Sequence, residues 1–71
     1  MKTFQEVIDL WRYPSVLAAD IGAKPATVEK WRQRNEIPGR HWMAIAMAAK
    51  DRKFPLTVEI LARIGAAISD K

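Results

Sequence analysis

Apolar residues recur along this chain at helical spacing, and no stretch alternates as a half-buried strand would. Near the start, Thr3 and Glu6 have the spacing of a capping box. An apolar stripe with i, i+3, i+4, i+7 spacing follows: Phe4, Val7, Ile8 and Trp11. This pattern predicts a first helix that carries Trp11 on its inner face and is ended by Pro14.

Two shorter helices are expected next, separated by about three residues. Ser15 is expected to cap the second helix, and Gly22 marks its end because glycine adopts a left-handed backbone at low cost. Pro25 suits the first turn of a third helix, expected over residues 25–35. The inward residues of this pair are apolar: Leu17, Ala18, Ile21, Val28 and Trp31.

The remainder predicts a fourth helix over about residues 40–50 and a fifth over about residues 57–69, separated by Phe54 and Pro55. The inward stripe of the fourth helix is expected to be Trp42, Ile45, Ala46 and Ala49. The whole pattern predicts one all-α domain over residues 1–71, a compact bundle of five helices.

Composition narrows the possible classes of protein. Hydrophobic residues make up 49% of the chain, which argues against intrinsic disorder. Cysteine is absent from the sequence, so neither a disulfide framework nor a thiolate metal site is available. The longest apolar run, residues 42–49, is far shorter than the roughly 20 residues of a membrane span, and polar residues follow Lys2 where a signal peptide would be apolar. These features favour a soluble, cytoplasmic protein.

Positive charge is concentrated in the middle of the chain. Residues 24–53 hold eight Lys or Arg against three Asp or Glu, a net charge of +5, whereas the whole chain carries +4. Such asymmetry suggests a polyanionic partner, and the alternative is a solvated basic surface with no partner.

The second and third helices meet the spacing of a helix-turn-helix pair. Ala18 supplies a small residue where the helices approach, Gly22 suits the turn four residues later, and Val28 returns to the core after six more. With these residues, the segment 14–33 resembles the motif of the Cro/CI type of phage repressor domain, and the resemblance extends to the helices before and after it. One departure is Pro14, which stands where the family favours a polar residue.

The resemblance implies a lambda repressor-like fold whose third helix enters the major groove of DNA. The family's contact positions fall here on Pro25 and on four candidates for base contacts: Ala26, Glu29, Lys30 and Gln33. Helical geometry agrees, because Val28 and Trp31 occupy the inward face. Lys30 can donate to guanine, Gln33 can pair with adenine, and Glu29 can accept from a cytosine amine. For Glu29 the alternative is a surface carboxylate that pairs with Gln33 or Arg32.

Six residues suit the phosphate backbone better than the bases: Ser15, Lys24, Thr27, Arg32, Arg34 and Arg40. Thr27 can instead bond locally to the main chain. Arg40 is expected at the start of the fourth helix, where free N–H groups favour an anion.

The last two helices hold more apolar residues than one small core needs. A homodimer on a two-fold operator would use this surplus, with an interface formed by Met43, Met47, Val58, Ile60, Leu61, Ile64 and Ile68. The alternative is that the fifth helix covers the fourth within one chain.

These observations predict a sequence-specific regulator that binds double-stranded DNA, a Cro/CI-like repressor of phage or prophage type. The competing hypothesis is a protein adaptor or antitoxin module built on the same pair of helices. An enzyme is not expected, because one histidine and no cysteine leave little catalytic chemistry. No cofactor, metal or small-molecule ligand is expected, since His41 has no partner at ligand spacing.

Overall fold

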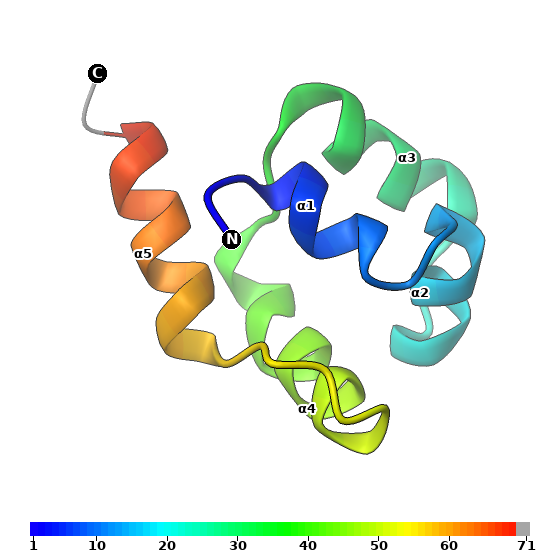
Figure 1. Cartoon of the computed structure of the whole chain (residues 1–71). Coiled ribbons are helices and arrows are strands. Elements are labelled where there is room, and N and C mark those ends of the chain that lie inside the picture. The colour runs from blue at the N-terminus through cyan, green and yellow to red at the C-terminus, as the bar shows by residue number, and fades with distance from the viewer. Residues whose placement is uncertain (70–71) are drawn as a thin grey trace.

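The computed structural model describes residues 1–69, and within that range it contains helices and no strand. The elements are α1 (Phe4–Asp9), α2 (Pro14–Ile21), α3 (Pro25–Arg34), a 3₁₀ turn η1 (Gly39–His41), α4 (Trp42–Asp51) and α5 (Val58–Ser69). In Figure 1, α1, α2 and α3 occupy one side of the molecule and α5 the other, with α4 at the lower edge between them. The principal extents are 32 × 24 × 20 Å. The prediction of an all-α fold with five helices is confirmed.

The first helix begins as predicted and ends earlier. The Glu6 N–H donates to Thr3 Oγ1 at 3.1 Å, which is the first half of the capping box. After Asp9 the chain tightens, because the N–H groups of residues 10, 11 and 12 donate to the carbonyls of residues 7, 8 and 9. Trp11 therefore reaches the core, with only 3% of its surface exposed, from a tight turn and not from the helix face that the stripe predicted.

The second helix starts one residue before the expected cap. Tyr13 is the N-cap residue, in an extended conformation, and Pro14 is the first helical residue. Proline suits that position because its φ is already helical and its missing N–H would have no partner in the helix. The prediction that Ser15 caps α2 was wrong, since Ser15 lies inside the first turn with its side chain exposed.

One apolar core is shared by all five α-helices. Leu17 of α2, Val28 of α3, Ile45 of α4 and Leu61 of α5 are all fully covered. The other buried apolar residues are Phe4, Val7, Ile8, Trp11, Ala18, Trp31, Ile37, Ala48, Ala49, Leu56 and Ile64. Of the inward stripe predicted for the fourth helix, Ile45 and Ala49 are buried and the other two residues are half-buried. The assignment of Trp31 to the core is confirmed.

The chain enters α4 through the 3₁₀ turn η1, so the helix begins at Trp42 and not near residue 40. The Trp42 indole N–H donates to the Ile37 carbonyl at 2.8 Å, which ties the start of α4 to the preceding loop. A Cβ at Gly65 of α5 would lie 3.1 Å from the Trp42 ring. The absence of a side chain at Gly65 therefore lets α5 approach the start of α4 closely.

The fifth helix is anchored at its start. Thr57 Oγ1 accepts a hydrogen bond from the Ile60 N–H at 3.2 Å, as an N-cap residue does. Before it, the Phe54 ring packs edge-on against Trp11 with ring centroids 5.1 Å apart. The predicted break at Phe54 and Pro55 is confirmed, and the contact with Trp11 fixes it to the turn that follows α1.

Candidate nucleic-acid interface

Helices α2 and α3 are joined by only three residues, 22–24. Gly22 has a φ of 72°, in the left-handed region that glycine adopts without steric cost. The N–H of Ala23 donates back to the Ala18 carbonyl at 2.9 Å, which closes the end of α2. Ala18 and Val28 are fully covered, so the small residue and the returning apolar residue occupy the positions that their spacing predicted.

The outward face of α3 is mainly polar, with Ala26 as its one small apolar residue among the four base-contact candidates. All four residues predicted to contact bases are exposed: Ala26, Glu29, Lys30 and Gln33. They share one side of the helix because Val28 and Trp31, at 0% and 7% exposure, occupy the other. This side is therefore accessible to a macromolecular surface, and it presents donors, an acceptor and a methyl group together.

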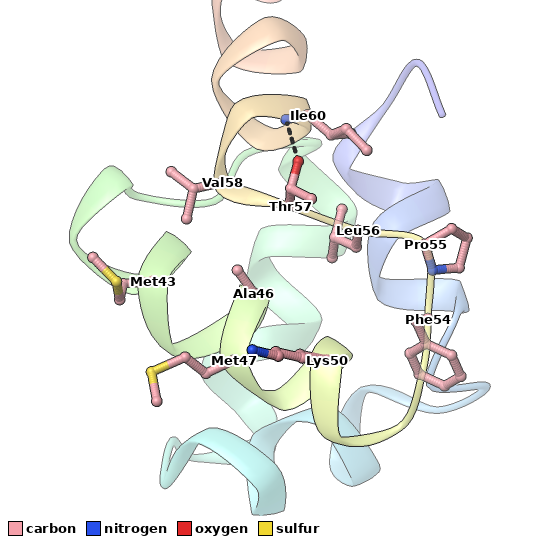
Figure 2. A pocket seen from close by; sticks show the side chains of 10 residues that line it. All are labelled: Met43, Ala46, Met47, Lys50, Phe54, Pro55, Leu56, Thr57, Val58 and Ile60. Carbon is pink, nitrogen blue, oxygen red and sulfur yellow. Dashed lines mark hydrogen bonds between the residues drawn. The ribbon is translucent and has the colours of Figure 1, made fainter.

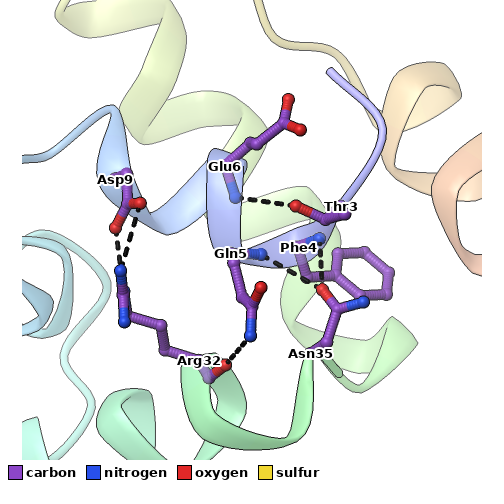
Figure 3. Close-up of polar contacts among 7 residues, drawn as sticks. All are labelled: Thr3, Phe4, Gln5, Glu6, Asp9, Arg32 and Asn35. Carbon is purple, nitrogen blue, oxygen red and sulfur yellow. Dashed lines mark hydrogen bonds and ion pairs between the residues drawn. The ribbon is translucent and has the colours of Figure 1, made fainter.

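The orientation of α3 is fixed by polar contacts with α1 that the sequence did not predict (Figure 3). Asn35, in a left-handed conformation after α3, accepts hydrogen bonds through Oδ1 from the N–H groups of Phe4 at 2.9 Å and Gln5 at 3.2 Å. In return, Gln5 Nε2 donates to the Arg32 carbonyl at 2.9 Å. Asn35, just after α3, thus caps the first N–H groups of α1, and Gln5 of α1 pairs with a carbonyl group in the last turn of α3. These main-chain groups at the two helix ends are therefore hydrogen-bonded.

Arg32 forms an ion pair that also joins these two helices. Its Nε lies 2.9 Å from Asp9 Oδ1, and Nη2 lies 3.3 Å from Oδ2 (Figure 3). The hydrogen bond from Arg32 lowers the pKa of the Asp9 carboxyl below its ordinary value and raises that of the guanidinium. Because both side chains are about half exposed, Arg32 remains accessible, but a phosphate would have to compete with Asp9 for it.

The other residues predicted to contact phosphates lie in α2, at the start of α3 and in the last turn of α3. Lys24 is the N-cap residue of α3, and Arg34 is in its last turn; both are exposed, as is Ser15 in α2. Thr27 is half-buried in the first turn of α3. Neither Lys24 nor Arg34 takes part in an ion pair within residues 1–69.

Arg40 lies in η1 and not in the first turn of a fourth helix, as the sequence had suggested. Its Nε donates to Nε2 of His41 at 3.3 Å, and the His41 ring packs on Trp31 with centroids 4.7 Å apart. This stacking joins η1, with the exposed Arg40, to the inward side of α3 at Trp31.

A second ion pair was also missed. Asp20 of α2 accepts from the Trp11 indole at 2.8 Å and from Arg52 Nη2 at 3.1 Å. The hydrogen bond from Arg52 is the main cause that lowers the pKa of the Asp20 carboxyl, and the Trp11 hydrogen bond acts in the same direction. These contacts join α2 to the turn after α1 and to the end of α4, so Asp20 has a structural role in holding α2 against these two segments.

An open apolar hollow of about 620 Å³ lies between α4 and the start of α5 (Figure 2). Met43 and Met47 project from α4 toward the side on which Val58 extends, and their exposed fractions are 65%, 63% and 39%. Ile60 also contributes to the lining, and Lys50 is the one charged residue there. Four of the residues predicted for a dimer interface therefore gather at one surface.

The other three residues of that predicted interface lie elsewhere. Leu61 and Ile64 are 0% and 3% exposed, so they form part of the core of a single chain, and their assignment to an interface was wrong. The inner face of α5 covers the core within one chain, as the alternative interpretation held. Ile68 is half-buried in a separate hollow beside Ile37 and Trp42.

Comparison with known proteins gives no relative from which a role can be taken. No protein-family model matches the chain, and no curated protein or solved structure matches it significantly. Within residues 1–69 no three metal-binding side chains gather as a metal site would require. Over the same range, none of the helices has the length and apolar character needed to cross a membrane.

Proposed function

We propose that this protein binds double-stranded DNA in a sequence-specific manner and regulates transcription, with α2 and α3 acting as a helix-turn-helix. In this proposal α3 enters the major groove and α2 crosses above it. The role resembles that of a Cro/CI-like repressor of phage or prophage type, which acts on a two-fold operator.

The observation that carries the proposal is the outward face of α3. Four exposed side chains with base-reading chemistry share that face, and two exposed cations, Lys24 and Arg34, lie at the two ends of the same helix. A third exposed cation, Arg40, lies in η1. Polar contacts through Asn35, Gln5 and Asp9 hold α3 at a fixed angle to α1. Fixed orientation suits DNA recognition, because base edges are read only by donors and acceptors held in register.

The proposal divides the site into two kinds of contact. Ala26, Glu29, Lys30 and Gln33 meet base edges, whereas the surrounding cations and hydroxyls meet phosphates. A duplex that neutralises several of these cations releases condensed counterions, so the affinity falls as salt concentration rises.

Two substitutions test this division. Lys30→Ala is expected to relax or change the base-pair preference at one position of the site. The free energy that discriminates between base pairs there should fall by about 1–3 kcal/mol. Arg40→Ala is expected to weaken binding to matched and scrambled duplexes alike. The wild-type site is first selected from a random duplex pool, and mobility shifts at two salt concentrations then compare the variants. Equal behaviour of the two variants, or failure of the wild type to bind any duplex at low salt, would contradict the proposal.

We further propose that the protein binds DNA as a homodimer that pairs through the hollow of Met43, Met47, Val58 and Ile60. Two-fold operators are matched by two-fold proteins, and the exposed methionines are apolar surface without a partner in the chain. Sedimentation over a range of concentrations tests this: a strict monomer at high micromolar concentration would refute the dimer.

The same hollow favours a second candidate function, in which the fold is a protein adaptor or an antitoxin module. Methionine-rich surfaces adapt to different partners because the side chain is flexible and polarisable. The two candidates differ in the role of α3, since an adaptor would keep its activity when Lys30 is replaced.

A further inference from the structure

The end of α1, the turn after it and the start of α2 meet α3 at a polar hollow of about 270 Å³. From the N-terminal side it is lined by Asp9, Arg12 and Pro14, and from α3 by Glu29, Arg32 and Gln33. Two of the residues proposed to face bases thus share a surface with Arg12, which the sequence motif does not include.

The backbone of Arg12 is in an uncommon conformation. Its φ is 73°, and its N–H donates to the Asp9 carbonyl at 3.0 Å in the tight turn that follows α1. Glycine would adopt this left-handed geometry at lower cost, so the turn alone does not account for an arginine here. The side chain is exposed, and no ion pair within residues 1–69 involves it.

The hollow as a whole is neutral, because Arg12 and Arg32 stand against Asp9 and Glu29. Asp9 is paired with Arg32, whereas no ion pair within residues 1–69 joins Arg12 to Glu29, so the Arg12 guanidinium is free to bind an anion. Pro14 has no N–H to donate, so it cannot supply the polar contact expected at the start of α2. A planar guanidinium can bind a phosphate through two parallel hydrogen bonds.

We propose that Arg12 binds a phosphate of the DNA backbone beside α3 and so sets the register in which Glu29 and Gln33 meet base edges. This inference rests on the proposed function, because it presumes a duplex against the outward face of α3. Arg12 is a positioning residue in this scheme: it contacts the backbone, and its effect on sequence selection is indirect.

Arg12→Gly removes the proposed phosphate contact without disturbing the fold, because glycine readily adopts the left-handed backbone conformation of this position. Lys53→Gly is the matched control: Lys53 also has a positive φ, 61°, and is exposed, but it lies in the turn after α4 and outside the hollow. Each variant loses one positive charge and relieves one left-handed backbone. A further variant, Arg12→Lys, keeps the charge on a different head group.

The affinity for the selected duplex is measured against salt concentration, with thermal unfolding as the check on folding. We expect Arg12→Gly to keep its thermal midpoint, to bind about eightfold more weakly at 0.1 M salt, and to lower the salt slope by about 0.9, the value of one phosphate contact. Lys53→Gly is expected to bind as the wild type does, because a distant charge is screened. Arg12→Lys is expected to recover part of the affinity.

Phosphate-ethylation interference provides the second readout. One phosphate whose ethylation blocks the wild type should cease to matter for Arg12→Gly. Equal affinities and slopes for the Arg12→Gly and Lys53→Gly variants would overturn the inference, as would an unchanged interference pattern. If Arg12→Gly does not fold, Arg12→Lys and Arg12→Ala replace it. Unchanged affinity and an unchanged interference pattern in both variants would overturn the inference. Loss of interference at one phosphate in Arg12→Ala would support the inference. A wild type that binds no duplex refutes the proposed function itself, and the inference with it.

Discussion

The α1–α3 junction and the α4–α5 junction are held together by different kinds of interaction. Between α1 and α3 there are three side-chain hydrogen bonds that join helix ends and one ion pair, involving Asn35, Gln5, Asp9 and Arg32. Between α4 and α5, no side-chain hydrogen bond occurs within residues 1–69, and the contacts are apolar. Hydrogen bonds depend on direction, whereas the hydrophobic effect does not.

This difference agrees with the use proposed for each surface. A helix that reads base edges must keep one orientation, and the polar contacts at α1 restrict the orientation of α3. A surface that pairs with a second copy needs apolar area, and α4 supplies it through Met43 and Met47. The same short chain thus presents a mainly polar face on α3 and an exposed apolar surface on α4.

The largest expected effect tests the apolar junction. Leu61→Ala removes a fully covered side chain from the core and should lower the free energy of unfolding by about 2–5 kcal/mol. Urea denaturation measures this loss. Met47→Ala, at a 63% exposed position, is the control and should change stability far less. A loss below about 1 kcal/mol for Leu61→Ala would show that α5 does not cover the core.

The polar junction is tested by two substitutions at Asn35. Asn35→Ala removes the acceptor of two main-chain hydrogen bonds. It also places alanine, which has no polar side chain to stabilise a left-handed backbone, at a φ of 52°. We expect a loss of about 2 kcal/mol in the free energy of unfolding. Asn35→Gly keeps the backbone geometry and should lose only the hydrogen-bond part, about 1 kcal/mol. If the two variants are equally stable, the left-handed backbone contributes nothing to the difference.

A smaller effect on stability is expected from a change of pH, through the ion pair between Asp20 and Arg52. Arg52 holds the pKa of the Asp20 carboxyl below its ordinary value. A lowered pKa in the folded state means that the stabilisation is complete above the pKa of the unfolded chain, near 4, and is lost as pH falls through the folded value. Asp20→Asn should therefore show a shallower decline of the thermal midpoint between pH 5 and about pH 2 than the wild type. Parallel declines would show that this pair does not contribute.

The smallest effect on stability is expected at the apolar hollow. Met47→Lys should leave the free energy of unfolding within about 0.5 kcal/mol, because the position is exposed. Its self-association, measured by sedimentation, should fall sharply if the hollow is the dimer interface. Ala62→Lys, on an exposed part of α5 outside the hollow, is the control and should associate as the wild type does. Undiminished association of Met47→Lys would place the interface elsewhere.

Helical periodicity predicted much of this molecule correctly. It placed Val28 and Trp31 inward and the four base-contact candidates outward, because residue spacing alone determines which side of a helix each occupies. It failed at the ends of helices. Trp11 lies in a tight turn and not in the predicted helix, and α2 begins at Pro14 and is not capped by Ser15. Several local solutions compete at such ends, and packing selects among them.

The sequence by itself determined the helices, their breaks at glycine and proline, and the concentration of positive charge around α3 and α4. Only the tertiary structure decided which ends meet: Asn35 with the start of α1, Arg32 with Asp9, and Arg12 with the face of α3. The tertiary structure also decided which of the surplus apolar residues are buried: Leu61 and Ile64 lie in the core, whereas Met43 and Met47 are exposed. Periodicity is a local property, whereas these pairings join residues that are distant along the chain, so they follow from how the helices pack.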